Sequence, residues 1–577
     1  MMEKTQLKKL VDVAGGRLPA DLVIKNCKVV NVYSGTICEG DIAVSDGIIA
    51  GVGCYEGATE IDAEGRYAAP GFIDSHIHIE SSYVTPEEMG RLVVPYGTTT
   101  IIADPHEMVN VCGLKGLSFM LDAASETALD IRFMIPSCVP ATPFEHAGAV
   151  IDAAAMQGPI ADERILGVGE FMDFPGVINA EDGAMDKLLL ARKMGKLVDG
   201  HSPGVSGKAL NAYASTLIHT DHECSTIEEM HDRIDRGMYV LLREGSACHE
   251  LAHLLKGVTA ANSRRCLLCS DDRQPKTILE KGHLDEHLRI LVHAGIDPIV
   301  AIQMASLNAA ECFRLFDRGA IAPGLRADIV LLDDLKEFKA DAVFIEGRLV
   351  ARQGRYLLEV TRHSIEQVRG SFHVKDFSVE KLKLKLTRDD VTTIDILPGG
   401  VVTAKGKARI VRDEHGCFIY DSSQDIVKVA VVERHQATGN VAVALLRGYG
   451  ITEGAVAISI AHDSHNIIVV GVNDDDMAVA VQSLIAQNGG MVLVKDRKIL
   501  ASMPMPVGGI MSDQSGEWVD RKLSEIHEVA YRELHVKEDV EPIMTLCFMS
   551  LAVIPEVKLT DMGLFDVTTF SFIAVEA

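Results

Sequence analysis

Residues 68–78 read AAPGFIDSHIH, a short apolar run that ends in two histidines. Seven further runs follow, and each is apolar and then closed by polar or titratable residues: TTTIIADPH (98–106), IRFMIPSCV (131–139), RILGVGEFM (164–172), KLVDGHSP (196–203), STLIHTDHE (215–223), MYVLLREGS (238–246) and RCLLCSDD (265–272). Stretches with helical character, such as AEDGAMDKLLLARKMG (180–195), separate these runs. Eight strand-then-helix units in about 250 residues predict a (β/α)8 TIM barrel, whose active site lies at the C-terminal ends of the strands.

The two flanks of this region have a different texture. DLVIKNCKVVNVYSG (21–35) consists of short apolar runs broken by turn residues, and ADAVFIEGRLVARQGR (340–355) resembles it. From residue 372 onward, β-like runs such as QDIVKVAVVERH (424–435) alternate with helical segments. We therefore predict an α/β chain with three domains: a small β-sandwich domain built from both flanks (1–69 and 320–371), the barrel (70–319) and a C-terminal α+β domain (372–577).

The bulk composition limits the partners of the chain. It has 56 Lys and Arg against 82 Asp and Glu, a net charge of −26, which disfavours nucleic acid because phosphates would be repelled. The sequence contains neither a secretory signal nor about 18 consecutive apolar residues, so we expect no membrane span. Twelve cysteines without framework spacing are typical of a reducing, cytoplasmic compartment. We therefore expect a cytoplasmic protein that acts on a small molecule.

The residues that close the runs predict a metal centre. His76 and His78 are two apart, so on a strand both point to the same side. Such a pair alone carries a high risk of a false match. However, four more metal-capable residues close the fourth, fifth, sixth and eighth runs: Glu170, His201, His222 and Asp271. The presence of all six residues at the ends of the runs favours a metal centre over the alternative, which is two histidines on a polar strand edge.

Six ligands are too many for one tetrahedral ion and suit two divalent ions about 3.5–4 Å apart. We expect His76, His78 and Asp271 to bind one ion and His201 and His222 to bind the other, with Glu170 between them. A hydroxide shared by the two ions would be the nucleophile, because metals lower the pKa of bound water. Asp271 would take its proton and pass it to the leaving group.

At this point the sequence resembles a known family. PGFIDSHIHIESS (70–82), DPHE (104–107), GVGEFMDFPGV (167–177), DGHSPG (199–204) and CSDDR (269–273) are similar to the amidohydrolase superfamily, and specifically to its bacterial and archaeal adenine deaminases. Many members of the superfamily carry a carboxylated lysine on the fourth strand, whereas this chain has Glu170, as the adenine deaminase branch is expected to have. The resemblance implies hydrolysis of adenine to hypoxanthine and ammonia, Mn(II) or Fe(II) in preference to Zn(II), and a homo-oligomer of two or more chains.

Each of the other residues on the same rim has a functional and a structural interpretation. Asp272 would hydrogen-bond a purine nitrogen or anchor the adjacent loop. His106 would contact the substrate, orient the hydroxide or cap the following helix. Arg243 and Glu244 end the seventh run and would line the pocket or remain solvated, as many charges on a barrel rim do.

Three histidine motifs remain. HDSHN (462–466), which includes His465, is either an Asx-type turn or a loop that closes the pocket and contacts substrate. HLDEH (283–287) matches a zinc-protease pattern, but it follows the eighth strand without a third ligand, so we expect partly exposed helix residues there. His219 lies three residues before His222, and this odd spacing predicts that it points away from the metals.

Two other functions compete with adenine deamination. A metal centre of this kind would also serve an amidohydrolase that cleaves a cyclic amide or an N-acyl group, although Glu170 in place of lysine and the long C-terminal region oppose it. A barrel that has lost catalysis and acts as a scaffold would lack one or more ligands, whereas this chain retains all six.

Overall fold

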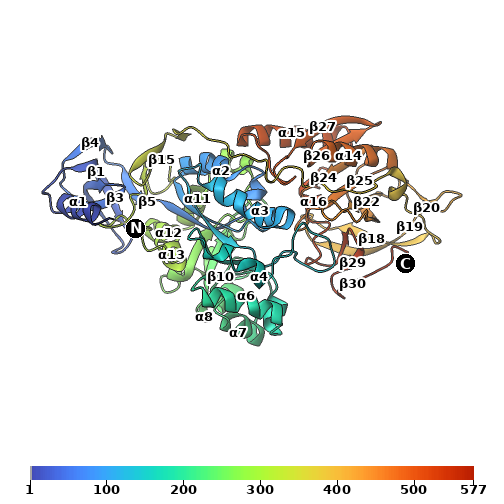
Figure 1. The fold of residues 1–577 in the computed structure, drawn as a ribbon, viewed down its shortest axis with the longest axis horizontal. Coiled ribbons are helices and arrows are strands. Elements are labelled where there is room, and N and C mark those ends of the chain that lie inside the picture. Colours follow the sequence, from blue (N-terminus) through green and yellow to red (C-terminus); the bar gives the residue numbers. More distant parts are fainter. Residues whose placement is uncertain (1–2, 577) are drawn as a thin grey trace.

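The computed structural model describes residues 3–576, which form three portions side by side along the long axis (Figure 1). The middle portion contains eight short parallel strands: β6 (Phe72–Ile77), β7 (Thr98–Ala103), β8 (Asp130–Ile135), β9 (Ile165–Phe171), β10 (Leu197–Gly200), β11 (Thr220–Asp221), β12 (Tyr239–Arg243) and β13 (Cys266–Cys269). They coincide with the eight predicted runs. Since parallel strands covered on both faces bury all their side chains, β6 and β7 are buried throughout.

These strands form two hydrogen-bonded arcs, β6 to β10 and β11 to β13. The arcs meet at two seams. At one seam the backbone N–H of Asp271 donates to the carbonyl of His76, and the N–H of His78 donates to the carbonyl of Asp271, each at 3.0 Å. At the other, the N–H of His219 donates to the carbonyl of Val198 at 3.4 Å. The strands thus close into a barrel-like ring.

Helices connect the strands around this ring: α2 (Pro86–Val93), α3 (His106–Ala124), α4 (Ala153–Met156), α5 (Phe174–Ile178), α6 (Asp182–Lys193), α7 (Gly207–Ser215), α8 (Ile227–Asp235), α9 (Leu251–Leu254), α10 (Pro275–Lys281), α11 (Leu284–His293), α12 (Pro298–Met304) and α13 (Leu307–Cys312). Their inner faces and the outer faces of the strands share one large apolar core. This core holds the strand ends, and therefore the side chains that close each run, in fixed positions.

The two flanks of the chain share one nine-stranded sheet. Its strands are β1 (Ala20–Asn31), β2 (Thr36–Ser45), β3 (Ile48–Gly53), β4 (Gly57–Asp62), β5 (Tyr67–Pro70), β14 (Ile329–Leu332), β15 (Ala340–Ile345), β16 (Arg348–Arg352) and β17 (Arg355–Tyr356). The antiparallel pairing of β5 with β14 joins the flanks. Because β5 also pairs with β1, the strands form one continuous sheet rather than the two separate sheets expected of a sandwich. Helix α1 (Lys4–Ala14) packs against β2 and β3.

The C-terminal portion is built on an eight-stranded sheet with the order β19-β18-β23-β22-β25-β24-β26-β27. Its strands are β18 (Asp390–Ile396), β19 (Thr403–Arg409), β22 (Ile426–Val432), β23 (Val441–Arg447), β24 (Ala455–Ile458), β25 (Ile467–Gly471), β26 (Gly490–Lys495) and β27 (Lys498–Pro504). Its longer helices are α14 (Asp474–Ala486) and α15 (Gly516–Arg532).

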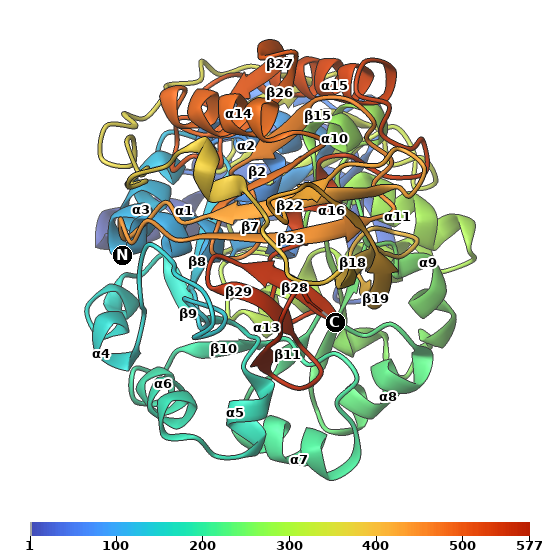
Figure 2. The same ribbon diagram turned by 90° about the vertical axis from the view of Figure 1, so that its right-hand side faces the viewer.

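Shorter elements complete this portion: β20 (Val411–Arg412), β21 (Phe418–Ile419), α16 (Met544–Cys547), β28 (Val557–Thr560), β29 (Gly563–Asp566) and β30 (Ser571–Phe572). Figure 2 shows the C-terminal portion in front of the barrel. The connection between β24 and β25, residues 459–466, extends to the barrel and contacts α3. Within residues 3–576, no helix is long and apolar enough to cross a membrane.

Candidate metal centre

The ends of the barrel strands bring the six predicted ligands into one cluster, in which His201 is partly exposed and the other five are buried. His76 and His78 leave the end of β6 with their Nε2 atoms 3.1 Å apart. The Nε2 atom of His78 lies 3.2 Å from Oδ1 of Asp271 and 3.4 Å from Oε1 of Glu170. The period-two spacing of the two histidines thus aims both rings at the same point, as the sequence predicts.

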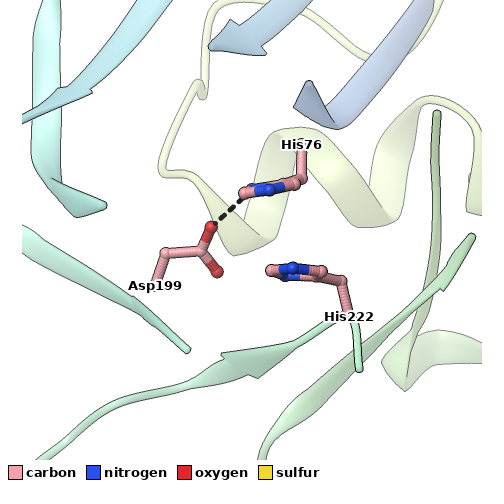
Figure 3. A group of neighbouring side chains, drawn as sticks. All are labelled: His76, Asp199 and His222. Atoms are coloured by element: carbon pink, nitrogen blue, oxygen red, sulfur yellow. Dashed lines mark hydrogen bonds and ion pairs between the residues drawn. The ribbon is translucent and has the colours of Figure 1, made fainter. Parts of the chain in front are cut away.

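The hydrogen bonds behind these two rings define which nitrogens face the cluster. Nδ1 of His78 lies 3.0 Å from the carbonyl oxygen of Asp104, which can only accept, so this nitrogen carries the hydrogen. Nδ1 of His76 lies 3.0 Å from a carboxylate oxygen of Asp199 (Figure 3). In the neutral rings, both Nε2 atoms therefore present lone pairs to each other.

Two lone pairs at 3.1 Å repel each other unless a cation lies against them. Imidazole rings that donate from one nitrogen to a carboxylate or a carbonyl are the usual arrangement of histidine metal ligands. The donor set of imidazoles and carboxylates therefore fits a divalent metal ion at this position.

Glu170 connects the two halves of the cluster. Its Oε1 faces His78, and its Oε2 lies 2.9 Å from Nδ1 of His201 and 3.2 Å from Nε2 of His222. The ring of His222 stacks on that of His76 with a centroid separation of 4.0 Å (Figure 3). Burial opposes ionisation of Glu170, but hydrogen bonds from His201 and His222 hold the pKa of its carboxyl well below the usual range.

Local backbone geometry at the end of β9 holds Glu170 in place. Its N–H donates to Oδ2 of Asp104 at 2.9 Å, which ties the end of β9 to the end of β7. This approach requires Gly169, because a Cβ at that residue would lie 1.9 Å from the same carboxylate oxygen. Gly169 therefore leaves room for the carboxylate of Asp104, which holds the next residue, Glu170.

Asp271 lies at the barrel seam with a φ of 56°, a left-handed conformation uncommon for a residue with a side chain. Its Oδ1 faces His78, and its Oδ2 accepts a hydrogen bond of 2.8 Å from Arg243. Burial opposes ionisation, but the hydrogen bond from His78 and the charge of Arg243 hold the pKa of Asp271 well below the usual range.

The other two carboxylates on Arg243 are those of Glu223 and Glu250, at 2.5 and 3.0 Å. Because three carboxylates already accept its hydrogen bonds, Arg243 orients Asp271. Glu244, also predicted to line the pocket, instead hydrogen-bonds His249 at 2.6 Å. Neither residue lines the chamber next to the cluster, and a contact of either with substrate stays a prediction.

A chamber adjoins the cluster. Its lining combines acidic groups with apolar ones and comes from both the barrel and the C-terminal portion: Glu80, Ser81, Tyr83, Glu107, Ser246, Asp272, Gln274, Ile460, His462, His465, Ile510 and Met544. Asp272 accepts a hydrogen bond from Ser81 at its edge. The chamber contains no lysine or arginine in its described lining, which favours an uncharged ligand over a phosphorylated one.

The HDSHN segment closes this chamber from the C-terminal side. Both His462 and His465 hydrogen-bond the carboxylate of Glu107, one to each oxygen. Nδ1 of His465 also accepts the N–H of Ala461 at 3.0 Å. Of the two readings of this segment, the pocket-closing loop agrees with these contacts, and an exposed surface turn does not.

His106 lies between the cluster and this loop. It begins α3, and its Nδ1 lies 3.3 Å from Oε1 of Glu170 while its Nε2 lies 3.9 Å from Asp463. The ring packs edge-on against that of His78, with centroids 4.5 Å apart. Its position is compatible with contact to substrate.

Four carboxylates that support the site were not among the predicted residues: Glu80, Asp104, Glu107 and Asp199. Each is near-completely buried. Asp104 and Glu107 flank the predicted His106 in DPHE, and Asp199 lies two residues before His201 in DGHSP. The rule that a ligand histidine needs an acceptor behind it predicts that such carboxylates exist, but it does not say that Asp199 supports His76.

The prediction for HLDEH was wrong in one respect. His283 and His287 are fully buried rather than partly exposed. His287 Nε2 hydrogen-bonds the carbonyl of Cys269, and His283 Nδ1 hydrogen-bonds Thr98, so both rings attach α11 to the barrel wall. His219 lies outside the cluster with its Nδ1 2.7 Å from the carbonyl of Val198, as its odd spacing predicts.

Comparison with known proteins agrees with this geometry. The amidohydrolase family model matches residues 67–350, and the adenine deaminase C-terminal domain model matches residues 400–571. A protein named adenine deaminase 2 from Desulfotalea psychrophila is 66% identical over 576 residues, covering 100% of both chains. The adenine deaminase of Ligilactobacillus salivarius is 52% identical, again covering 100% of both chains. The chain therefore belongs to the adenine deaminase family of the amidohydrolases.

Proposed function

We propose that this protein hydrolyses adenine to hypoxanthine and ammonia. The observation that carries the proposal is the buried cluster in which Glu170, rather than a lysine, lies between His78 on one side and His201 and His222 on the other. The adjoining chamber, which combines hydrogen-bonding and apolar side chains without a lysine or arginine among its described lining residues, suits a neutral purine base.

Two divalent ions, Mn(II) or Fe(II) in preference to Zn(II), would be held by the six clustered residues. His76, His78 and Asp271 would bind one ion, and His201 and His222 the other, with Glu170 between them. Such ions would lower the pKa of the attacking water. Two observations support this proposal. The Nε2 atoms of His76 and His78 face each other at 3.1 Å, and the clustered donors are all imidazoles or carboxylates.

The protein's own residues would carry the protons. Asp271, held by Arg243 at 2.8 Å, would accept a proton from the water that attacks C6 of adenine and return it to the exocyclic nitrogen, so that ammonia leaves. Asp272 and His106 would contact the base, since the first lines the chamber and the second lies between Glu170 and the chamber wall. His465 would act by closing the chamber through Glu107.

The alternative, cleavage of a cyclic amide or an N-acyl group, uses the same kind of metal centre. It is disfavoured by the glutamate at position 170 and by the C-terminal loop that closes the chamber. We also propose that the chain is divided into domains at 1–69 plus 320–371, 70–319 and 372–577. Assembly into a dimer or larger oligomer is proposed on the family resemblance and is tested by light scattering.

The function is tested by ammonia release after reconstitution with Mn(II). Adenine, adenosine, cytosine and dihydroorotate are offered in parallel, and bound metal is counted by elemental analysis. Turnover of adenine alone with about two ions per chain supports the proposal. Turnover of dihydroorotate without turnover of adenine would replace it with the cyclic amide alternative.

A further inference from the structure

A groove opens at the end of the barrel opposite the metal-ligand cluster. It is bounded by residues at the beginnings of β10, β11 and β12 and by α6, α7 and α13, of which β10, α6 and α7 lie near the lower edge of Figure 1. The cavity measures about 400 Å³. None of the six clustered metal-ligand candidates lines it, so it is a separate feature of the molecule.

Positive charge gathers around this groove although the chain as a whole carries −26. Four of its lining residues are cationic: Arg192, Lys196, Arg236 and Arg314. Among the described residues that line it, Glu311 is the acidic one, and it is already paired with Arg264. The field inside the groove therefore favours an anion.

Three of these cations have no acidic partner within residues 3–576. Arg236 is paired with Asp232, but no ion pair involves Arg192, Lys196 or Arg314. Nζ of Lys196 donates to the carbonyl of Asp162 at 3.0 Å, and Nη1 of Arg314 donates to that of Gly195 at 3.1 Å. Backbone carbonyls orient these two side chains, and no carboxylate among the described residues lies within ion-pair distance of either, although Asp162 and Glu163 lie near Lys196.

His219 adds a hydrogen-bond acceptor to the groove. Its Nδ1 lies 2.7 Å from the carbonyl of Val198 and so donates, and the neutral ring then presents a lone pair at Nε2. That Nε2 is buried and meets no partner with hydrogen-bond geometry among the described residues, although the backbone of Cys312 also lies near the ring. A buried polar atom without a partner is costly, so a ligand with a hydroxyl or N–H group would satisfy it.

We propose that this groove binds a small phosphomonoester. The phosphate would lie among Arg192, Lys196 and Arg314, since guanidinium groups form strong paired hydrogen bonds with phosphate oxygens. A hydroxyl on the carbon frame would donate to Nε2 of His219. The apolar side chains of Leu217 and Met238, which also line the groove, would contact that frame.

The proposal is tested by isothermal titration of the metal-loaded protein with ribose 5-phosphate, inorganic phosphate and ribose. Arg192→Gln combined with Arg314→Gln removes two of the cations. Lys193→Gln combined with Lys208→Gln is the matched control, because it removes two positive charges from α6 and α7 at residues that do not line the groove. His219→Phe removes the acceptor and retains an aromatic ring.

We expect saturable binding of ribose 5-phosphate, weakened at least about tenfold by the double variant and by less than about twofold in the control. Ribose should not bind, and inorganic phosphate should bind more weakly than the ester and be insensitive to His219→Phe. Absence of saturable binding overturns the proposal. Binding that the double variant does not weaken also overturns the proposal, because the phosphate would then lie outside the groove. Equal affinity for inorganic phosphate and ribose 5-phosphate overturns recognition of the ester.

Discussion

The substitution Asp199→Asn directly tests how hydrogen bonds orient the histidines of the metal centre. Asp199 touches no substrate; its Oδ2 accepts from Nδ1 of His76, and its Oδ1 accepts from the N–H of Gly200 at 2.9 Å and from the hydroxyl of Thr220. Burial opposes ionisation, but the hydrogen bond and the charge of His76 hold the pKa of Asp199 below its usual range. The side chain is fully buried, so it has no water to replace a lost partner.

Asp199→Asn replaces two accepting oxygens by one oxygen that accepts and one NH2 group that donates. The backbone N–H of Gly200 can only donate, so the orientation that keeps its hydrogen bond to residue 199 turns the amide oxygen of Asn toward Gly200 and its NH2 toward His76. Nδ1 of His76 then has to accept, which moves the ring hydrogen to Nε2, the nitrogen that faces the cluster. His76 would no longer offer a lone pair to a metal ion. Loss of such a supporting partner costs about 10–100-fold in metal affinity or activity.

The assay combines elemental analysis with ammonia release at several Mn(II) concentrations. The variant should bind fewer ions at low Mn(II) and recover part of its activity at high Mn(II). Thr220→Val is the control, because it removes the hydroxyl that donates to Asp199 and accepts from the N–H of Gly200 while it leaves the hydrogen bond of His76 in place, and its activity should stay within about tenfold of the parent. If the Asn variant keeps full metal content and full activity, the tautomer argument for His76 is refuted.

Three further changes have defined outcomes. Asp271→Asn removes the proposed proton carrier and should lower kcat about 10²–10⁴-fold in ammonia release with Mn(II) in excess; near-parental kcat would remove Asp271 from that role. Glu107→Gln weakens the contacts to His462 and His465 and should lower kcat/KM about 10–100-fold with metal content unchanged, whereas loss of metal would show that Glu107 supports the cluster instead. Burial lowers the pKa of Lys558 from 10.5 to about 7, so the folded state disfavours its charged form. This penalty is full below about pH 7 and fades as the pH rises toward 10.5, so Lys558→Met should stabilise the protein by roughly 2–4 kcal/mol at pH 6.5 and by less at pH 9, measured by thermal unfolding; equal effects at both pH values would contradict the shift.

The barrel and its metal-capable rim could be predicted because each depends on local patterns. A buried parallel strand reads as an unbroken apolar run, and the residue that ends it lies on the catalytic face. The spacing of His76 and His78, and the odd spacing of His219 and His222, follow from the alternation of side chains along a strand. These rules require no knowledge of which strands are neighbours.

The residues that support the ligands could not be predicted in the same way. Asp104 supports Glu170, 66 positions away, and Asp199 supports His76, 123 positions away. Which carboxylate stands behind which histidine depends on the register of neighbouring strands, and this register is a property of the packed barrel. Arg243 shows the same limit: its place on the rim was predictable, but two of its three acidic partners, Glu223 and Asp271, come from other loops.

The contact between Glu107 and His465 spans 358 positions and joins two portions of the chain with separate sheets. No periodicity links DPHE to HDSHN, so the sequence left the turn and the pocket-closing loop as equal readings. The chemistry of the residues still narrows the choice. A buried carboxylate such as Glu107 requires donors, and two histidines three residues apart on one loop can supply one to each oxygen. The chamber is therefore completed by the C-terminal portion, and a barrel without it would leave Glu107 without these partners and the chamber open to water, which weakens every electrostatic interaction inside.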